Sequence, residues 1–312
     1  MNDREFAAAL CDRDAILILS HLRPDGDTLG SGAALCSALR RMGKTAYMFP
    51  NPETTARYLP YVAQFFAPAD FVPACVVAVD IATPDLFPQG FSGAVDLCVD
   101  HHPSNLHYAG DTLLHAEKSA CGEAVLELIE LLTGSVTEQE ANLLYIAVTT
   151  DTGCFRFNNT TADTLRCAAA CKDTGADTFA INTALFMTKR LPRLQLEARL
   201  TEEMEFYAGG AVAVNTLPNV LLVELGLTED DVDDISGFSR EIAGVEIGVM
   251  LREGPDGGKI SLRCSPKYDA AAICARLGGG GHRGAAGASV PEGLDAAKKA
   301  ILQAIADSGV EL

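Results

Sequence analysis

The stretch Leu97-Cys98-Val99-Asp100-His101-His102 joins a short apolar run to an aspartate and two histidines. Short runs of aliphatic and β-branched residues are typical of strands that are buried in a parallel sheet. In an open sheet of this kind the strand ends meet at one edge, and ligands bind outside those carboxyl ends. The stretch therefore predicts an α/β fold with a polar site at that edge.

Three further clusters of acidic residues and histidines lie at comparable positions. His21-Leu22-Arg23-Pro24-Asp25-Gly26-Asp27 and Asp80 follow strand-like runs at 15–20 and 76–79, and Asp151 follows a helix-like run. Taken alone, an aspartate after a strand is more often a cap or turn residue. Carboxylates gathered at this density repel one another unless cations neutralise them. Together the four clusters predict a metal centre.

The types of ligand in these clusters narrow the choice of metal. Imidazoles and carboxylates without a thiolate favour Mn²⁺, with Mg²⁺, Co²⁺ and Zn²⁺ as alternatives. Asp25 and Asp27 are two residues apart, so their side chains can diverge toward two different ions, and Gly26 between them allows a tight turn. Two ions about 3.5–4 Å apart suit the displacement of a phosphoester. His107 and His115 lack such context and are expected to be structural.

The first part of the chain alternates strand-like and helix-like segments. Expected strands lie at 15–20, 44–49, 76–80 and 94–100, and expected helices at 29–42, at 119–132 and after the capping box Thr137-Glu138-Gln139-Glu140. Alternation of this kind predicts an α/β domain with a mostly parallel sheet and helices on both faces.

The segment from Arg190 to Tyr207 is charged, contains Pro192 and carries leucines at helical spacing, which predicts a connecting helix. Beyond it, strands are expected at 211–215, 220–223, 245–252 and 259–264, a hairpin turn at Gly257-Gly258, and helices at 269–277 and 294–306. The pattern predicts a catalytic domain at 1–187, a linker at 188–207 and a smaller α+β domain at 208–312.

A glycine run, Gly278 to Gly287, stands out in the second domain. Consecutive glycines let backbone N–H groups approach an anion or a base closely, although such a run taken alone is more often a flexible loop. Four basic residues, Arg263, Lys267, Arg276 and Arg283, lie near it in a chain whose formal net charge is −18. This local basic island predicts a binding site for substrate phosphate.

The composition excludes several classes of protein. The chain has 312 residues, of which 48% are hydrophobic, so it can form two cored domains. No apolar run approaches the ~18 residues of a membrane span, and the amino terminus lacks the pattern of a secretory signal. Ten cysteines without a C-x2-C pair indicate a reducing compartment, so a cytoplasmic location is expected. The acidic balance argues against a surface for long duplex DNA.

The order of His21, Asp25, Asp27, Asp80, Asp100-His101-His102 and Asp151 resembles the DHH phosphoesterase superfamily, and specifically its bifunctional oligoribonuclease and PAP phosphatase (nanoRNase) branch. The glycine run is similar to the signature of the DHH-associated second domain, so the resemblance covers nearly the whole chain. It implies a centre of two divalent ions, most often Mn²⁺. One ion would be held by His21, Asp25 and Asp80, and the other by Asp27, Asp80, His101 and Asp151.

The resemblance also implies roles for residues around the metals. Asp100 would orient a histidine, and His102 would contact the scissile phosphate. The residues expected to bind substrate are Arg263, Gly279, Gly280, Gly281 and His282.

The activity implied by the resemblance is hydrolysis of short oligoribonucleotides to nucleoside monophosphates and of 3′-phosphoadenosine 5′-phosphate (pAp) to AMP. The expected partners are short single strands, linear dinucleotides or pAp, with no membrane and no long duplex DNA; the oligomeric state is open, a homodimer included. One alternative is a phosphodiesterase specialised for linear dinucleotides such as pApA. Others are a family II inorganic pyrophosphatase, a RecJ-like exonuclease and, from another class, a non-catalytic nucleotide- or RNA-binding module.

Overall fold

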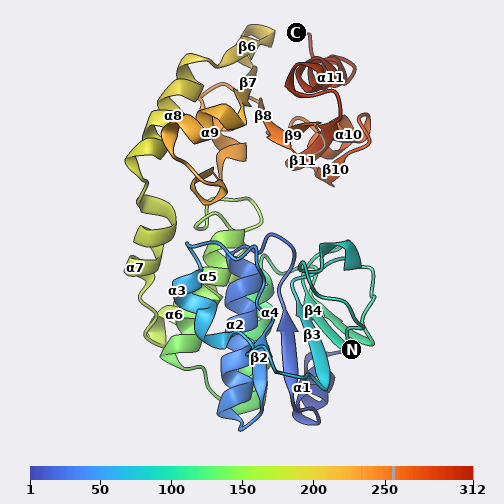
Figure 1. The fold of residues 1–312 in the computed structure, drawn as a ribbon, viewed down its shortest axis with the longest axis vertical. Coiled ribbons are helices and arrows are strands. Elements are labelled where there is room, and N and C mark those ends of the chain that lie inside the picture. The colour runs from blue at the N-terminus through green and yellow to red at the C-terminus, as the bar shows by residue number, and fades with distance from the viewer. Residues whose placement is uncertain (233, 255–256, 312) are drawn as a thin grey trace. The chain divides into compact units, whose positions relative to one another are not determined.

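The computed structural model describes residues 1–232, 234–254 and 257–311. The chain divides into two compact units, Met1–Thr188 and Lys189–Leu312, which Figure 1 colours from blue to green and from yellow to red. Each unit has its own sheet and its own apolar core. The expected boundaries of the domains and of a linker at 188–207 stay a prediction.

The first unit is built on a five-stranded sheet in which every strand is parallel to its neighbours, in the order β2-β1-β3-β4-β5. The strands are β1 (Ile16–Leu19), β2 (Ala46–Met48), β3 (Cys75–Val79), β4 (Leu97–Asp100) and β5 (Asp111–Leu114). The expected α/β class with a parallel sheet is confirmed. The edge strand β5 was not expected, because only Leu113 in it is buried.

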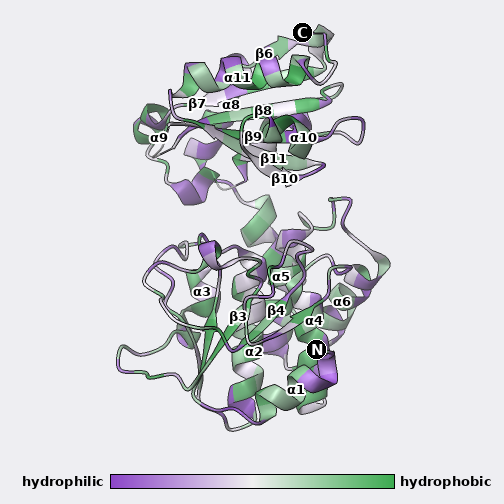
Figure 2. Cartoon of the chain, turned by 90° about the vertical axis from the view of Figure 1, so that its right-hand side faces the viewer, coloured by the Kyte–Doolittle hydropathy of each residue, from purple (hydrophilic) through white to green (hydrophobic). Residues whose placement is uncertain are grey.

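Successive residues of the strands β1, β3 and β4 enter different apolar clusters. Ile16 and Ile18 pack in the main core, whereas Leu17 and Leu19 pack in a second cluster. The strands β3 and β4 are accordingly green, that is hydrophobic, in Figure 2. This is the alternation that a strand buried on both faces requires.

The helices of the first unit contribute to the main core. They are α1 (Asp3–Cys11), α2 (Gly26–Arg41), α3 (Leu59–Val62), α4 (Cys121–Thr133), α5 (Glu138–Asp151), α6 (Ala162–Asp173) and α7 (Thr178–Asn182), with the single turns η1 (Ala63–Phe65), η2 (Pro84–Leu86) and η3 (Thr183–Met187). In the described part of this unit, aromatic side chains of loops, such as Phe49, Phe87 and Phe91, cover the second face of the sheet, where helices were also expected. These large rings shield the strands from water without needing a helix.

The second unit contains a six-stranded mixed sheet in the order β10-β11-β9-β8-β7-β6. Its strands are β6 (Glu205–Tyr207), β7 (Val212–Leu217), β8 (Ile247–Gly254), β9 (Gly257–Cys264), β10 (Gly280–His282) and β11 (Ala285–Val290). Only the β7–β8 pairing is parallel among these described strands. The helices and turns are α8 (Leu191–Glu202), η4 (Ala208–Gly210), α9 (Asn219–Leu225), η5 (Glu229–Val232), η6 (Ile235–Glu241), α10 (Ala270–Ala275) and α11 (Leu294–Ala306).

Two expectations for the second unit are wrong. The segment 220–223 lies in helix α9, which follows Pro218 and ends at Gly226 in the left-handed conformation, so the helix signals outweigh the β-branched valines. Gly257 and Gly258 belong to strand β9 and pair with β8, and the residues between the strands, 255 and 256, lie outside the described ones. Gly258 needs to be a glycine because a Cβ there would lie 2.6 Å from the Gly293 carbonyl oxygen.

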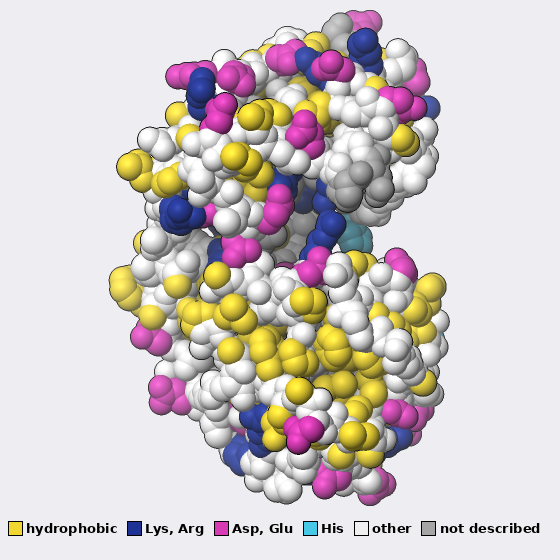
Figure 3. All heavy atoms as spheres, in the orientation of Figure 1, with side chains coloured by type: hydrophobic (Ala, Val, Ile, Leu, Met, Phe, Trp, Pro, Cys, Tyr) yellow, Lys and Arg dark blue, Asp and Glu magenta, His cyan; other side chains and the backbone are white. Residues whose placement is uncertain are grey.

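Charged side chains are spread over both units. On the face drawn in Figure 3, lysine and arginine side chains are few and lie among aspartates and glutamates, so this face has no broad basic surface. Within the described part of the chain, no helix combines the length and the apolar character that a membrane span would need.

Candidate metal centre

Adjacent strands of the first sheet bring the predicted polar residues to one edge. His21, Asp80 and His101 each follow the end of a strand, and these strands, β1, β3 and β4, are neighbours in the sheet. Asp80 adopts a positive φ of 61°, which is uncommon for a residue other than glycine and turns the chain sharply after β3. The order of the strands therefore brings these residues together at the carboxyl edge of the sheet, as expected.

The helices supply the remaining side chains. Asp25 is the N-cap of α2, Asp27 lies in its first turn, and Asp151 is the last residue of α5. The potential ligand atoms form three groups within which they lie within 4.8 Å of one another: Asp80 with His101 and His102, His21 with Asp25 and Asp80, and Asp27 with His101 and Asp151. All seven residues singled out for the metal site from the sequence thus lie together, with Asp80 and His101 shared between groups.

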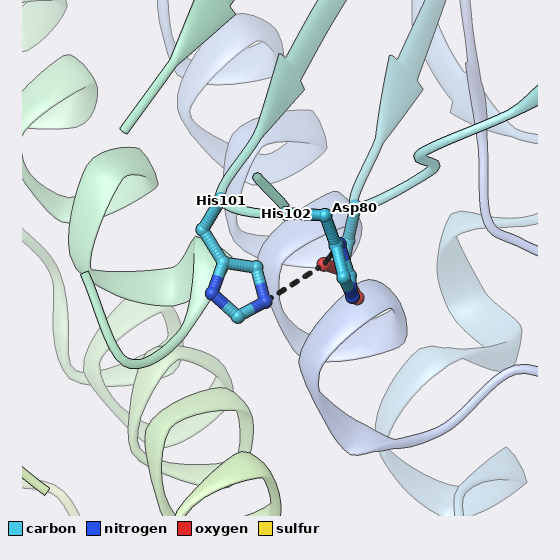
Figure 4. Close-up of side chains that lie close together, drawn as sticks. All are labelled: Asp80, His101 and His102. Atoms are coloured by element: carbon cyan, nitrogen blue, oxygen red, sulfur yellow. Dashed lines mark ion pairs between the residues drawn. The ribbon is translucent and has the colours of Figure 1, made fainter. Parts of the chain in front are cut away.

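Two histidines turn one ring nitrogen toward the carboxylates. The Nδ1 atoms of His21 and His101 lie 2.8 and 3.1 Å from the carbonyl oxygens of Leu22 and Lys118. A carbonyl oxygen only accepts hydrogen bonds, so each Nδ1 carries the hydrogen and each Nε2 can offer a lone pair. His101 Nε2 lies 3.4 Å from Asp80 Oδ1 and 3.6 Å from Asp151 Oδ2, and Figure 4 draws the first of these pairs.

The Asp80 carboxylate is buried, but one of its oxygens makes no hydrogen bond. Its side chain is 3% exposed, yet its Oδ1 atom has no hydrogen-bond partner. Oδ1 lies 3.4 Å from His101 Nε2 and 3.5 Å from His102 Nδ1, which are ion-pair contacts longer than ordinary hydrogen bonds, so its lost hydration is replaced only in part. His21 Nε2 is 3.8 Å from the other oxygen, which is longer than an ordinary hydrogen bond. The donor set, imidazole nitrogens and carboxylate oxygens around an unpartnered oxygen, fits divalent cations.

Asp27 is oriented by the amino-terminal end of helix α4. Its carboxylate accepts hydrogen bonds from the backbone N–H groups of Cys121 (2.6 Å) and Gly122 (2.9 Å) and from the Ser31 hydroxyl (3.0 Å). A helix N-terminus stabilises a negative charge. A Cβ on Gly122 would lie 2.7 Å from the Ala147 methyl group, so glycine allows α4 to approach α5 this closely.

Asp100 joins the two histidines to a buried asparagine. Asp100 Oδ1 accepts hydrogen bonds from the backbone N–H groups of His101 (2.8 Å) and His102 (3.2 Å) and from His102 Nδ1 (2.8 Å). Asp100 Oδ2 accepts from Asn105 Nδ2 at 2.6 Å. His102 donates through Nδ1, and when the ring is protonated its Nε2 carries a hydrogen that can be donated to an anion. The sequence interpretation missed Asn105, although its position five residues after Asp100 was a signal that could have indicated it.

The clustering of charges shifts several pKa values. Burial raises the pKa of Asp27 well above its usual range, and the charges of Asp80 and Asp151 add to this effect. Burial and neighbouring carboxylates also raise the pKa of Asp151 to about 7. Burial acts to lower the pKa of His21, but Asp25 and Asp80 outweigh it and raise that pKa to about 10. The metal-free site therefore holds protons that a divalent cation would displace.

The residues expected to bind substrate lie in the second unit. Arg263, in β9, donates hydrogen bonds to the Ser236 hydroxyl (2.8 Å) and to the Leu262 carbonyl oxygen (3.1 Å). No ion pair with a carboxylate is found for it among the described residues, and burial lowers its pKa. Such a guanidinium suits an anionic ligand. His282 is exposed on β10.

The glycines of the run have different reasons to be glycine. A Cβ on Gly279 would lie 2.1 Å from the Gly287 carbonyl oxygen, and Gly281 has a φ of 143°, so these two are required by the pairing with β11. Nothing lies within 4 Å of a Cβ built on Gly280. Of the three, only Gly280 leaves open space for a ligand. His115, expected to be structural, bonds to Asp3 and Glu117, and with Asp3 and Glu127 it forms a separate group whose potential ligand atoms lie within 4.8 Å of one another.

Two family models match the chain. The DHH family, N-terminal domain, matches residues 15–148, and the DHHA1 domain matches residues 209–307. The chain is 33% identical over 294 residues to the bifunctional oligoribonuclease and PAP phosphatase NrnA of Thermus thermophilus, covering 93% of this chain and 89% of that protein. It is 27% identical to the Bacillus subtilis protein of the same name, over 89% of this chain and 90% of that one.

A solved structure has the same fold. The crystal structure of an exopolyphosphatase-related protein from Bacteroides fragilis superposes with a TM-score of 0.87 at 22% identity, covering 98% of this chain and 95% of that one. At this level of identity the likeness concerns the fold alone.

Proposed function

Because the chain belongs to the DHH phosphoesterase family, in the branch of the bifunctional oligoribonucleases and PAP phosphatases, we propose that it hydrolyses short oligoribonucleotides to nucleoside monophosphates and pAp to AMP. The single observation that supports this most strongly is the buried Asp80 Oδ1, which makes no hydrogen bond and lies among histidines and carboxylates. A cation-dependent phosphoesterase needs such a cluster, whereas a structural carboxylate would have a hydrogen-bond donor.

The proposed cofactors are two divalent ions, with Mn²⁺ as the favoured metal. His21, Asp25 and Asp80 would hold one ion, and Asp27, Asp80, His101 and Asp151 the other. The group of His21, Asp25 and Asp80 matches the first set, and the group of Asp27, His101 and Asp151 matches the second without Asp80, whose Oδ1 lies 3.4 Å from His101 Nε2. When bound, the ions activate water and neutralise negative charge on the phosphoryl oxygens.

The side chains around the ions have distinct tasks. The Ser31, Cys121 and Gly122 donors hold Asp27 in one orientation. Asp100 accepts the Nδ1 hydrogen of His102, so that in the protonated imidazole the Nε2–H is left to donate to the scissile phosphate. Arg263, Gly280 and His282 are proposed to bind a phosphate and the terminal nucleotide of the substrate.

The proposal also covers the partners and the location. The substrates are short single strands, linear dinucleotides or pAp, and the net charge of −18 disfavours long duplex DNA. The ten cysteines are all free, in keeping with a reducing cytoplasm. A division into a catalytic domain at 1–187, a linker at 188–207 and a substrate-binding domain at 208–312 belongs to the same proposal.

Chromatographic analysis of products tests this function. The protein is incubated with Mn²⁺ and, side by side, pAp, pApA, a five-unit RNA and pyrophosphate. We expect AMP from pAp and monophosphates from the RNA, both lost in Asp80→Ala and retained in Asp85→Ala, which removes an exposed carboxylate on η2.

The other outcomes separate the alternatives. Cleavage of pyrophosphate alone indicates a pyrophosphatase, and cleavage of pApA alone indicates a dinucleotide phosphodiesterase. Binding of the RNA without any product indicates a non-catalytic module. Retained activity in Asp80→Ala, with an unchanged circular dichroism spectrum, would refute the role of Asp80.

A further inference from the structure

The loop that follows the candidate ligand Asp151 presents an exposed aromatic ring. Phe157 is 55% exposed, whereas Phe155, two residues earlier, packs against the main core. In the described part of the chain, Phe157 is not a member of any apolar cluster. Singly exposed apolar side chains are common on protein surfaces, and Phe179 is more exposed still, so the case for Phe157 depends on how and where its ring is held.

The ring is held in a defined place on the loop that directly follows Asp151. A Cβ built on Gly153 would lie 2.4–2.7 Å from three atoms of the Phe157 ring, so the ring rests directly on the Gly153 backbone. Gly153 is two residues after Asp151. The Phe157 N–H donates to the carbonyl oxygen of the buried Thr152 at 3.0 Å, and Asn159 Nδ2 donates to the Asp151 carbonyl oxygen at 3.1 Å.

The backbone of this loop is unusual. Gly153, Cys154 and Phe155 have positive φ values of 55°, 57° and 63° in succession. Two of them are not glycine, and such residues persist in this conformation only where their surroundings hold them; they occur often at functional sites. The loop is therefore a fixed support, so the ring of Phe157 would lose little conformational freedom when it binds a ligand.

A cation lies next to the ring in sequence. Arg156 is exposed, and its Nε donates to the Gly153 carbonyl oxygen at 2.6 Å. The described residues provide no carboxylate in an ion pair with it. An aromatic ring beside a free guanidinium is the combination that binds single-stranded nucleotides, because the ring stacks on a base and the cation attracts a phosphate.

We propose that Phe157 is a stacking platform for a nucleobase of the substrate and that Arg156 binds the phosphate next to that base. This inference rests on the proposed function and adds a base-binding subsite to it. The subsite belongs to the first unit and adjoins Asp151, so it would favour substrates with a base close to the phosphate at the metals. Stacking accepts any base, which suits an enzyme for short RNAs of mixed sequence.

The test is a cycle of protein variants and substrates. Wild type, Phe157→Ala and Phe157→Tyr are assayed with Mn²⁺ on an RNA dinucleotide and on two versions of it that lack one base each. Phe157→Ala is expected to lower kcat/KM on the intact dinucleotide by about 5-fold to 150-fold, the range for losing one base–aromatic stack. On the version that lacks the stacked base it should change nothing, and Phe157→Tyr should stay within about twofold of wild type.

The matched control is Phe179→Ala, which removes a phenylalanine that is 74% exposed on α7 of the same unit, and it should leave kcat/KM unchanged. The inference is overturned if Phe157→Ala has no effect, or if it reduces activity equally on intact and base-lacking substrates.

Failure of the proposed function gives a different result. In that case wild type hydrolyses none of the dinucleotides. The affinities for AMP and for ribose 5-phosphate, measured by calorimetry, then test whether Phe157 binds a base. We then expect wild type to bind AMP more tightly than ribose 5-phosphate and Phe157→Ala to lose this preference. An equal preference in both proteins would overturn the inference.

Discussion

Replacing Asn105 with alanine should weaken both the fold and the activity, because its buried side chain supports Asp100. Asn105 is 7% exposed and its side chain makes four hydrogen bonds: Nδ2 donates to Asp100 Oδ2 (2.6 Å), to the Ile81 carbonyl oxygen (3.3 Å) and weakly to Cys98 Sγ (3.7 Å), and Oδ1 accepts from the His107 N–H (2.7 Å). The first of these is short and involves a fully buried carboxylate. It is the bond whose loss should matter most.

These bonds set the size of the effect. A hydrogen bond to a charged group contributes about 1.5–3 kcal/mol and a neutral one about 1 kcal/mol, and the 3.3 Å bond lies at the weak end. The free energy of unfolding should therefore fall by about 3–5 kcal/mol. For a unit of this size, that lowers the Tm by roughly 10 °C. Asp100 would also hold His102 less firmly, so kcat should fall by about 10-fold to 100-fold.

Urea denaturation and steady-state kinetics with pAp test this prediction together. Asn142→Ala is the control, because Asn142 also makes two hydrogen bonds, to the Glu138 carbonyl oxygen and from the Asp177 N–H, but far from Asp100 in sequence and on the surface. It should cost no more than about 1 kcal/mol and leave kcat unchanged. An Asn105→Ala protein with wild-type stability and wild-type kcat would refute the proposed support of Asp100.

Three further predictions concern the substrate, the protons and the packing of the site. Arg263→Ala should raise the KM for pAp with a smaller loss of kcat. The control Lys298→Ala, which removes a lysine paired with Glu205 outside the basic island, should leave the KM unchanged. An unchanged KM in Arg263→Ala would remove Arg263 from the substrate site. Binding of Mn²⁺ at pH 7.5 should release protons and tighten as the pH rises. The pKa values of His21 and His101 are raised to about 10 and about 11, so the cation must displace protons from both rings. Calorimetry in two buffers of different ionisation enthalpy measures the release, and a binding enthalpy independent of the buffer would contradict it. Gly122→Val should lower the free energy of unfolding by about 1–3 kcal/mol and weaken Mn²⁺ binding. The Cβ of the valine would meet Ala147 and push the N–H donors of α4 away from Asp27. A Mn²⁺ affinity equal to that of wild type, measured by calorimetry, would show that α4 does not hold Asp27.

The sequence sufficed for the features that have local signals. Apolar runs that end in Asp80 or Asp100 predicted the strands and the edge at which the ligands meet, since all strands of a parallel sheet end on the same side. Helix α11 coincides with the expected 294–306, because its apolar residues recur at helical spacing.

Features that depend on tertiary contacts were beyond such reasoning. Strand β5 has a single buried residue and exists because β4 pairs with it. The donors to Asp27 at Cys121 and Gly122 lie more than 90 residues from it, so no local pattern connects them. The glycine run illustrates the same limit: its composition suggested a ligand loop, while Gly279 and Gly281 are fixed by their neighbours in the sheet.

The central claim is that two divalent ions share Asp80, and metal content measures it most directly. The protein is saturated with Mn²⁺, freed of excess metal by gel filtration and analysed by plasma mass spectrometry, alongside Asp80→Ala and Asp85→Ala. We expect two Mn²⁺ per chain in wild type and Asp85→Ala and fewer than two in Asp80→Ala. Wild type that retains no Mn²⁺, or Asp80→Ala that retains the full two, would contradict it.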